Sequence, residues 1–585
     1  MMKVSGEEDI YSISITTPSM PCLMWYFFMV ISNGRIYYYG NNENRLGGVG
    51  EISGNIPILY QITVYKNEAL PPAWFQDSVI YQIFVDRFFN GNEDGKVLNA
   101  KKNSLIHAHW ENDPIYIKDE KTGRIARWDF FGGNLLGVKK KLGYLKRLGI
   151  QVIYFNPIFE AQSNHKYDTG DYHKIDPMYG DEEIFRELVK EAGRLGISII
   201  LDGVFSHTGS DSVYFNKEGN YPSIGAYQSK ASPYFSWYRF NEFPHWYDCW
   251  WGIDLLPNVN ELDPFYQNFI IYDSNSVLKH WLREGIKGWR LDVADELPDT
   301  FIKKFKETLL EQEPDAVLIG EVWEDASNKI SYGQRREYLL GEELDSVMNY
   351  PFRQIVIDFL LGHRNAYSIH SHLMNLYENY PIHHFYSLMN LLGSHDVPRI
   401  LTVLQDALPV NMDDKKKKEI AIQRLKLAVL WQMTFPGVPS VYYGDEAGLE
   451  GGNDPLNRRG FPWGRENKEL FVWVQELIAI RNQYDVLRTG KWISLAIDSD
   501  IYAFIRQIEE GIDALGQKRK SNTSIILLNR NITHEKIVTL DISKWFKNGQ
   551  FVNVILPKEN IMVEHGIFTC RLKPLEGKVW VKICR

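Results

Sequence analysis

Four strand-length apolar segments that each end at an acidic residue constrain the fold of this chain more than any other feature. In sequence order they are ISIILDGVFSH (197–207), GIKGWRLDVADE (285–296), AVLIGEVWED (316–325) and SLMNLLGSHD (387–396). Short apolar runs that stop at a polar residue are typical of buried parallel strands, and in a (β/α)8 barrel such strand ends open on one face. We therefore expect one cleft to hold four acidic residues, Asp202, Asp292, Glu321 and Asp396.

The chain is too long, at 585 residues, for a single hydrophobic core, and its pattern divides it into three parts. Residues 1–72 alternate and turn like β structure and end at a Pro-Pro break, which predicts a small N-terminal β-domain. Over 73–485, strand-like runs alternate with helix-length segments such as EEIFRELVKEAGRLG (182–196), which predicts a TIM barrel of the α/β class. Short β-like runs over 486–585 predict a C-terminal β-sandwich.

The alternation stops within the predicted barrel over 207–263. This stretch is rich in aromatic residues, glycine and proline, and it includes YFSWYRFNEFPHWYDCWWG (234–252). A loop of this length inside a compact domain is usually functional.

Composition narrows the ligand and the compartment. A formal net charge of −9 with 24% charged residues argues against nucleic acid or an anionic membrane as the main partner, so a neutral ligand is favoured. The 17 Trp and 33 Tyr residues suit sugar faces, although large cores account for most of them. The cysteines have no metal-site spacing, which predicts a reducing, cytoplasmic compartment: Cys22, Cys249, Cys570 and Cys584. The apolar run 22–31 is too short to span a bilayer and is interpreted as a strand, so no membrane partner is expected.

Longer motifs resemble the α-amylase superfamily, glycoside hydrolase family 13, over about 73–485. They include WFQDSVIYQIFVDRFFNGN (74–92) and NHKYDTGDY (164–172), and they are similar to the branch that contains cyclomaltodextrinase, neopullulanase and maltogenic amylase. The resemblance implies that 207–263 forms domain B, an excursion after the third strand that shapes one wall of the cleft. In this branch a larger N-terminal β-sandwich helps to form a dimer. Here GRIYYYGNNENRLGGVGE (34–51) resembles its later half, so we expect a truncated domain, and a homodimer stays open.

The resemblance also assigns the reacting groups. Glycosidic cleavage needs one carboxyl group that attacks the anomeric carbon and one that protonates the leaving oxygen. By motif match, Asp292 in GWRLD is the nucleophile and Glu321 in IGEVW is the general acid/base. Arg290 lies on the same strand face as Asp292 and is expected to keep it ionised, whereas apolar neighbours favour a protonated Glu321. We expect the two carboxyl groups to lie about 5–5.5 Å apart, which is the retaining geometry.

Other positions match sugar-binding residues of the family. Asp396 in SHD matches the third carboxylate, which binds sugar hydroxyls and helps to distort the ring. The resemblance implies further sugar contacts at the reaction centre from His165, Tyr167, His207 and His395. It places Asp454 and Arg458 on the next glucose toward the non-reducing end and Trp323 on the reducing side. The predicted binding set is completed by Asp202, Arg290 and Glu296, the last on the acceptor side.

Departures from the family pattern lie at the edges of these motifs. Ser206 stands where Asn is usual before the histidine, and VADE brings Asp295 where the branch has VANE. LPNVN (256–260) replaces MPKL, and RRG replaces RRP after Arg458. The reaction centre is intact, so the reaction class is predicted while the substrate preference stays open.

A calcium site is suggested by NGNED (90–94) and GGN (132–134), because hard cations take clustered Asn and Asp oxygens and backbone carbonyls. The candidate ligands are Asn90, Asn92, Asp94, Gly132 and Asn134. Asn134 stands where the family usually has Asp, which weakens the site, and a metal-free turn is the alternative.

The leading hypothesis is a retaining α-glucan hydrolase acting on cyclodextrins, maltooligosaccharides, pullulan or starch, with some transglycosylation and with α-1,6 cleavage left open. An α-glucanotransferase or a glucoside isomerase of the same superfamily is the first alternative, because the motifs do not encode how water competes with a sugar acceptor. A remote alternative is a non-catalytic accessory subunit of an amino-acid transporter. Such subunits lose the catalytic acids and carry a membrane helix, unlike the pattern seen here.

Overall fold

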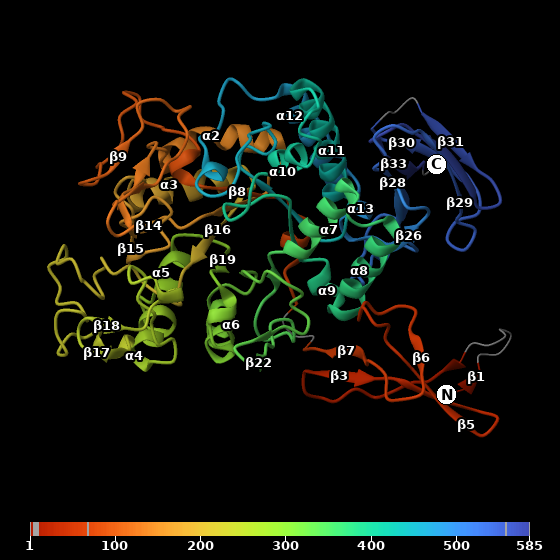
Figure 1. Ribbon diagram of the computed structural model, residues 1–585, viewed down its shortest axis with the longest axis horizontal. Helices are drawn as coiled ribbons and strands as arrows, with labels where there is room; N and C mark the ends of the chain where they lie inside the picture. The colour runs from red at the N-terminus through yellow and green to blue at the C-terminus, as the bar shows by residue number, and fades with distance from the viewer. Residues whose placement is uncertain (1, 4–10, 67–69, 556–558, 584–585) are drawn as a thin grey trace.

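The computed structural model describes residues 2–3, 11–66, 70–555 and 559–583. Cys584 and parts of 1–72 therefore lie outside the described residues. Figure 1 shows the barrel region at the left and centre, the N-terminal part in red at the lower right and the C-terminal part in blue at the upper right. Within the described ranges, no helix is both long and apolar enough to cross a membrane.

The predicted barrel is confirmed by an eight-stranded parallel sheet among the described residues. Its strands are β8 (Ile80–Ile83), β13 (Val152–Phe155), β16 (Ser198–Gly203), β19 (Gly288–Leu291), β20 (Val317–Gly320), β23 (Ser346–Val347), β24 (Met389–Leu391) and β25 (Val438–Tyr442). The order is β23-β20-β19-β16-β13-β8-β25-β24. A parallel bridge between Met348 and Met389 joins the two ends of this sheet and closes the barrel.

Helices cover the outside of the barrel. The longer ones are α2 (Leu135–Leu148), α3 (Glu182–Arg194), α5 (Val277–Arg283), α6 (Asp299–Gln312), α7 (Tyr350–Leu361), α8 (Ala366–Asn379), α10 (Ile400–Asp406), α11 (Asp414–Thr434) and α12 (Lys468–Gln483). Short helices are α1 (Ala73–Gln76), α4 (Pro264–Gln267), α9 (Ile382–Phe385) and α13 (Asp485–Thr489). Asp181 caps the start of α3 by accepting a hydrogen bond from Ile184 N, as the sequence DEEI favours.

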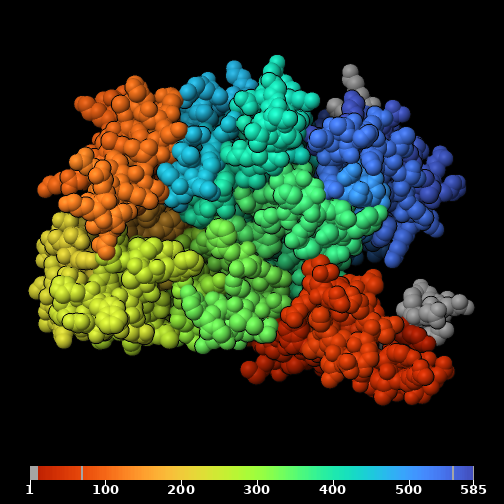
Figure 2. Space-filling view, viewed as in Figure 1, coloured from red at the N-terminus to blue at the C-terminus, as the bar shows by residue number. Residues whose placement is uncertain are grey.

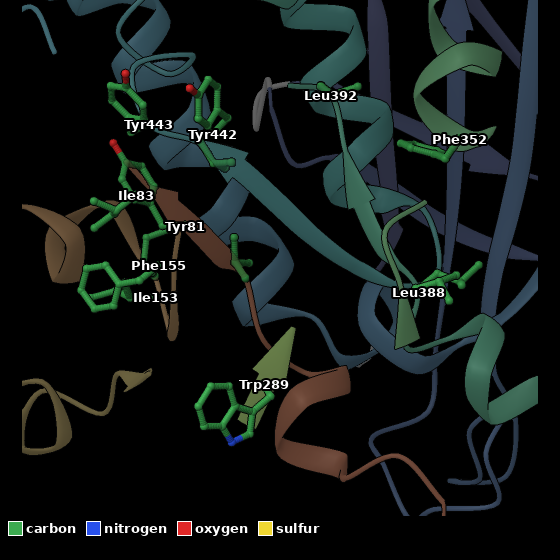
Figure 3. Close-up of a cluster of buried hydrophobic side chains, with 14 of the residues drawn as sticks. Tyr81, Ile83, Ile153, Phe155, Trp289, Phe352, Leu388, Leu392, Tyr442 and Tyr443 are labelled. Atoms are coloured by element: carbon green, nitrogen blue, oxygen red, sulfur yellow. The ribbon is translucent and has the colours of Figure 1, made fainter. Parts of the chain in front are cut away.

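Strand side chains alternate between the outer and the inner face of the barrel. The cluster packed against the helices includes Tyr81, Ile83, Ile153, Phe155 and Trp289, as Figure 3 shows. A second cluster fills the barrel with the alternate strand residues, which include Ile80, Val152, Tyr154, Ile200, Val317 and Ile319. The same alternation continues past the strand ends. The acids therefore lie on the inner face, at the mouth of the barrel.

Domain B occupies the predicted position after the third barrel strand, at the lower left of Figure 1. It contains the short strands β17 (Phe240–Glu242) and β18 (Trp246–Tyr247) and two 3-10 turns, η2 (Phe235–Trp237) and η3 (Trp250–Gly252). Its two ends are brought together by an antiparallel bridge between His207 and Asn258.

Further short strands and turns decorate the loops of the barrel. Before the second barrel strand these are η1 (Val85–Arg87), β9 (Leu105–Ile106), β10 (Ile117–Lys118), β11 (Ile125–Arg127) and β12 (Asp129–Phe130). Later ones are β14 (Phe159–Ala161), β15 (Thr169–Ile175), the π-turn η4 (Asn268–Tyr272), η5 (Ala294–Glu296), β21 (Ile330–Ser331), β22 (Gln334–Arg335) and η6 (Leu456–Arg458).

The N-terminal part consists, among its described residues, of small antiparallel sheets, and it protrudes from the rest of the molecule in Figure 2. Its strands are β1 (Met2–Lys3), β2 (Tyr11–Ser12), β3 (Cys22–Tyr26), β4 (Phe28–Ser32), β5 (Arg35–Gly40), β6 (Glu51–Ser53) and β7 (Tyr60–Val64). The run 22–31 is thus strand, as predicted. Thr63 joins this part to the barrel by donating a 2.6 Å hydrogen bond to the carbonyl of Asn379.

The C-terminal part forms two antiparallel sheets around its own core. Its strands are β26 (Lys491–Ala496), β27 (Ile501–Ile508), β28 (Asn522–Asn529), β29 (Lys536–Asp541), β30 (Gly549–Asn553), β31 (Asn560–Val563), β32 (Ile567–Leu572) and β33 (Gly577–Lys582). β29 pairs with β32, and the other strands form the larger sheet. Ile505, Leu527, Phe568 and Trp580 are fully buried between the two sheets, in agreement with the predicted sandwich.

Candidate active site

A cleft of about 1470 Å³ opens at the carboxyl ends of the barrel strands. Eleven of the predicted site residues line it: His165, Tyr167, His207, Asp292, Glu296, Glu321, Trp323, His395, Asp396, Asp454 and Arg458. Asp202 and Arg290 do not line it, because both are buried in the barrel beneath the acids that do. The predicted residues therefore lie together in two layers: an upper layer that lines the cleft and a buried lower layer of Asp202 and Arg290.

Arg290 is the centre of the lower layer. Its Nη1 atom lies 2.8 Å from Asp202 Oδ1 and 2.8 Å from Asp292 Oδ1, and its Nη2 atom lies 2.9 Å from Glu321 Oε2. The pairing of β16, β19 and β20 causes this arrangement, because Asp202 is the register partner of Arg290, which in turn pairs with Ile319. The sequence predicted the contact with Asp292, and the structure adds the other two carboxylates.

The carboxylate of Glu321 is oriented by two further donors. Its Oε2 accepts a 2.8 Å hydrogen bond from Val293 N, and its Oε1 accepts a 3.1 Å hydrogen bond from Trp323 Nε1. Val293 has a φ of 38°, a left-handed conformation that is strained for a β-branched residue. The strained residue directly follows Asp292, so the turn that follows Asp292 also holds Glu321.

The cluster carries more carboxyl groups than guanidinium groups. Burial raises the pKa of Asp202 and of Asp292, and repulsion from Glu321 and Asp202 adds to the effect at Asp292. Burial, followed by repulsion from Glu321, raises the pKa of Asp396 to about 7. Burial raises the pKa of Asp292 more than the shared charge of Arg290 lowers it, so the expectation that Arg290 keeps Asp292 ionised is wrong. The raised pKa values of these three carboxyl groups favour a proton shared within the cluster.

His395 acts as a neutral hydrogen-bond donor beside Asp396. Gln82 Nε2 donates a 3.0 Å hydrogen bond to its Nδ1, which leaves the proton on Nε2, 3.2 Å from Asp396 Oδ2 and in contact with Tyr167 Oη. Burial lowers the pKa of His395 well below its usual range. Tyr167 in turn donates a 2.9 Å hydrogen bond to Asp202 Oδ2, so the two layers are connected.

Both ring nitrogens of His207 form hydrogen bonds within the protein. Ser206 Oγ donates a 3.0 Å hydrogen bond to its Nδ1, and its Nε2 donates a 3.1 Å hydrogen bond to the carbonyl of Tyr167. Ser206, the departure from the usual Asn, thus fixes the His207 ring. His165 is neutral as well, because burial lowers its pKa to about 3, and its Nδ1 accepts a 3.1 Å hydrogen bond from Tyr167 N.

The predicted pair on the non-reducing side is present. Arg458 Nη1 lies 3.1 Å from Asp454 Oδ1, and Arg458 Nη2 lies 3.7 Å from Asp396 Oδ1. Trp323 is stacked on Tyr350 with ring centroids 4.0 Å apart, and it stays 45% exposed. It therefore offers aromatic surface in the cleft beside Glu321.

Several cleft residues were not singled out from the sequence. They are Tyr116 and Trp128 from the loop before the second barrel strand, Trp250 and Trp251 from domain B, and Tyr332. The isolated aromatics in WENDPIYIKDEKTGRIARWDF (110–130) were the available signal for the first two. Tyr116 donates a hydrogen bond to Asp454 Oδ2, which connects this loop to the Asp454–Arg458 pair.

The predicted calcium ligands form a turn that is closed by its own hydrogen bonds. Asn134 Oδ1 accepts from Gly91 N and Gly137 N, as the cap of α2, and Asn90 Oδ1 accepts from Asn92 N and Asn134 Nδ2. The amide groups of Asn90 and Asn92 both donate to the carbonyl of Lys96. Asp94 Oδ1 accepts from Lys96 N, and no group of three or more His, Cys, Asp or Glu in the described part of the chain could hold a metal. The Oδ1 atoms of Asn90, Asp94 and Asn134 thus accept N–H donors inside the turn, which favours the metal-free alternative.

Calcium removal is therefore expected to leave the stability of the protein unchanged. We expect EGTA to extract no ion, because Asn134 Oδ1 already accepts two N–H donors inside the turn. Melting temperature should be measured after EGTA dialysis and again with added calcium. A fall in melting temperature that calcium reverses would instead support the metal site predicted from the sequence.

Comparison with known proteins was made for the whole chain. The family description "Alpha amylase, catalytic domain" matches residues 82–509. An amylopullulanase of Thermoanaerobacterium saccharolyticum is 40% identical over 98% of this chain, which covers 47% of that relative. A cyclomaltodextrinase of Geobacillus thermopakistaniensis (strain MAS1) is 35% identical over 84% of this chain and 75% of its own length. The chain thus spans about half the length of the amylopullulanases that it matches.

Solved structures agree with this comparison. A structure described as a cyclomaltodextrinase has a TM-score of 0.72 at 27% identity, covering 97% of this chain and 88% of its own. The cyclic α-maltosyl-(1→6)-maltose hydrolase of Arthrobacter globiformis has a TM-score of 0.69 at 26% identity, covering 88% of this chain and 100% of its own.

Proposed function

This chain belongs to the α-amylase family, and on this premise we propose that it is a retaining α-glucan hydrolase that cleaves α-1,4 bonds and also accepts α-1,6 bonds. The observation that carries the proposal is the pair Asp292 and Glu321, held by one buried guanidinium at the floor of an aromatic-lined cleft. Relatives named amylopullulanase and neopullulanase support the breadth of the bond preference.

In the proposed reaction an Asp292 oxygen attacks the anomeric carbon and forms a glycosyl ester. Glu321 donates its proton to the glycosidic oxygen, which leaves as the hydroxyl of the departing glucan. Glu321 then takes a proton from water, whose oxygen attacks the anomeric carbon and releases Asp292. Arg290 contacts both acids. The same guanidinium therefore stabilises the negative charge on Asp292 before the attack and on Glu321 after it has given up its proton.

The binding residues act on the sugar at the centre of the cleft. Asp396 and the neutral His395 together offer an acceptor and a donor to neighbouring hydroxyls, while Tyr167 and His165 offer ring faces. Arg458 and Asp454 hold the next glucose toward the non-reducing end. An α-glucanotransferase remains the alternative. These contacts bind the donor sugar, whereas competition between water and a sugar acceptor is decided on the acceptor side of the cleft.

We also propose an α-glucan as the partner and a reducing, cytoplasmic compartment. Cys22, Cys249 and Cys570 are unpaired among the described residues, and a relative is named intracellular maltogenic amylase. Homodimer formation through the short N-terminal part stays a prediction. Size-exclusion chromatography coupled to light scattering tests it directly.

The function is tested with four substrates: β-cyclodextrin, pullulan, soluble starch and maltotriose. We expect release of maltose and glucose, with β-cyclodextrin opened faster than starch is cleaved, and products resolved by chromatography. Panose from pullulan would demonstrate cleavage of the α-1,4 bonds next to its α-1,6 bonds, whereas maltotriose from pullulan would demonstrate α-1,6 cleavage. Longer oligosaccharides growing from maltotriose with little net hydrolysis would identify a glucanotransferase, and no turnover of any substrate would contradict the proposal.

The pH dependence of kcat/KM on maltotriose should report the proton held by the acidic cluster. The pKa of Asp396 is raised to about 7 because the group is buried and repelled by Glu321. Replacing Asp396 with Asn removes this negative charge, so the remaining acids lose their shared proton more readily. We expect the alkaline limb to move to lower pH by about half a unit to one unit, along with a lower rate.

The matched control for this profile is Asp248→Asn, an Asp in domain B that does not line the cleft. It should reproduce the wild-type limb. A limb that stays in place, or moves to higher pH, in Asp396→Asn would show that Asp396 does not share in this titration.

A further inference from the structure

A short hairpin stands over the cleft between β20 and β23. It consists of β21 and β22, with Tyr332 and Gly333 at its tip. Both tip residues have positive φ, 51° and 76°, which is the two-residue turn that matches the twist of a hairpin. Gly333 adopts this conformation freely, whereas a bulky aromatic residue does so at a cost. The Tyr332 side chain is nevertheless 74% exposed, so core packing does not explain its position.

The hairpin is fastened to the barrel by Asp295, the residue that replaces the family's usual Asn. Lys329 Nζ lies 3.1 Å from Asp295 Oδ2, and Tyr338 donates a 2.6 Å hydrogen bond to Asp295 Oδ1. Arg336 donates a 2.9 Å hydrogen bond to the Asp295 carbonyl. Lys329 and Arg336 flank β21 and β22, so the departure at Asp295 and the position of the hairpin are coupled. Asp295 is thus a positioning residue for the hairpin tip.

The neighbouring acid, Glu296, joins the hairpin to domain B across the cleft. Its Oε1 accepts a 2.6 Å hydrogen bond from Tyr332 Oη and a 3.3 Å hydrogen bond from Trp251 Nε1. Trp251 also has a positive φ, 49°, and is 79% exposed. Two bulky aromatic residues from separate segments therefore adopt strained conformations and meet at one carboxylate. Strain of this kind persists where the surroundings require it and clusters at ligand clamps.

The clamp lies on the side of the cleft that receives the leaving group. The turn that carries Glu296 begins at Ala294, whose N–H donates to the carbonyl of Glu321, the proposed proton donor to the leaving oxygen. Trp323 lies on the same side, hydrogen-bonded to Glu321. In the opposite direction, the Trp251 ring stacks on Trp250, and Trp250 packs on His207 at the reaction centre. Aromatic surface thus runs from the reaction centre out to Tyr332.

We propose that Trp251 and Tyr332, clasped by Glu296, form an acceptor-side subsite for glucose units beyond the one that contacts Trp323. Both rings are exposed and each has one polar atom tied down, so their apolar surfaces are the parts left for a ligand. Pyranose rings present apolar C–H faces that pack on aromatic rings. The chemical class of ligand is therefore a linear α-glucan chain that extends past the cleavage point. This inference rests on the proposed function, since an acceptor side has meaning only for a glycosidase or transferase.

The test compares two substrates that differ on the leaving-group side. Maltohexaose fills the acceptor subsites, whereas α-maltosyl fluoride has a leaving group that reaches none of them. For Tyr332→Ala and for Trp251→Ala we expect the ratio of kcat/KM on maltohexaose to kcat/KM on α-maltosyl fluoride to fall about three- to tenfold. With maltohexaose labelled at its reducing end, the labelled products should become shorter, because binding modes with long acceptor segments lose affinity.

Trp246→Ala is the matched control, since Trp246 is also an exposed domain B tryptophan, at 64%, and does not line the cleft. Its ratio should equal that of the wild type. Tyr332→Phe keeps the ring but loses the bond to Glu296, so its ratio should lie between those of the wild type and Tyr332→Ala. A ratio within twofold of wild type in both alanine variants, with unchanged labelled products, would overturn the inference. Failure of the wild type to hydrolyse α-maltosyl fluoride and maltohexaose would overturn the proposed function, and the subsite with it.

Discussion

Replacing Asp292 with Asn is expected to lower kcat on maltooligosaccharides by about 10⁴-fold or more, because a neutral amide cannot form the glycosyl ester. The loss should not come from unfolding. Burial raises the pKa of Asp292, so its ionisation costs folding free energy at neutral pH, and the neutral isostere removes this cost. We therefore expect a melting temperature equal to or above that of the wild type.

The control for this prediction is Asp414→Asn, whose carboxylate is fully exposed at the start of α11 and does not line the cleft. It should match the wild type in rate and in melting temperature. Proton NMR of the first-formed sugar anomer completes the test, since retention requires that the wild type release the α-anomer first. A variant that keeps more than about one hundredth of the wild-type rate would exclude Asp292 as the nucleophile.

The second large effect is expected for Arg290→Met, which removes the cation shared by Asp202, Asp292 and Glu321. Deleting one partner of a buried ion cluster leaves uncompensated charge, and the expected loss of stability is about 3–5 kcal/mol at pH 7.5. Activity should fall to background in the same variant. Met has a similar length and fills the space, so a cavity does not account for the loss.

The pH dependence of this destabilisation identifies its electrostatic origin. Without Arg290 the buried acids have higher pKa values in the folded than in the unfolded chain, so the folded state binds more protons. Its stability then rises as pH falls, and the difference from the wild type should shrink between pH 7.5 and pH 5. Thermal melts of both proteins at the two pH values measure this. Arg465→Met, which removes an exposed arginine paired with Glu111, should change little at either pH. An equal loss at both pH values would indicate a packing defect instead.

The barrel and its acidic strand ends could be predicted because they depend on local patterns. A continuous apolar strand that stops at Asp292 or Glu321 predicts both a buried parallel strand and the face on which the acid emerges. The period of two also predicts that Arg290 lies on the same strand face as Asp292, and the two side chains are 2.8 Å apart. These features need no knowledge of which strands are neighbours.

Features that depend on neighbouring strands or on short irregular segments could not be predicted. The sharing of Arg290 with Asp202 requires the pairing of β16 with β19, which the chain order alone does not specify. Similarly, the His207 ring is engaged by the Tyr167 carbonyl because of the fold of an irregular loop. The Tyr332 hairpin has two residues in each strand and no hydrophobic period to reveal it. The calcium site stays a prediction, since the same Asn side chains are equally good turn formers.

The pairing of β25 with β8 gives the active site an all-or-none character, because it joins the first barrel strand to the last one in the sequence. Contributors to the cleft extend from Tyr116 to Arg458, and the sheet that aligns them becomes a closed ring only when β8 pairs with β25. Contacts of such long sequence separation form late, because the entropy of a long loop must be overcome first. We therefore expect no partly folded intermediate to be catalytically active. After dilution from denaturant, activity should recover at the rate of barrel closure and more slowly than the helices form. The rate at which activity returns would therefore measure the last folding step.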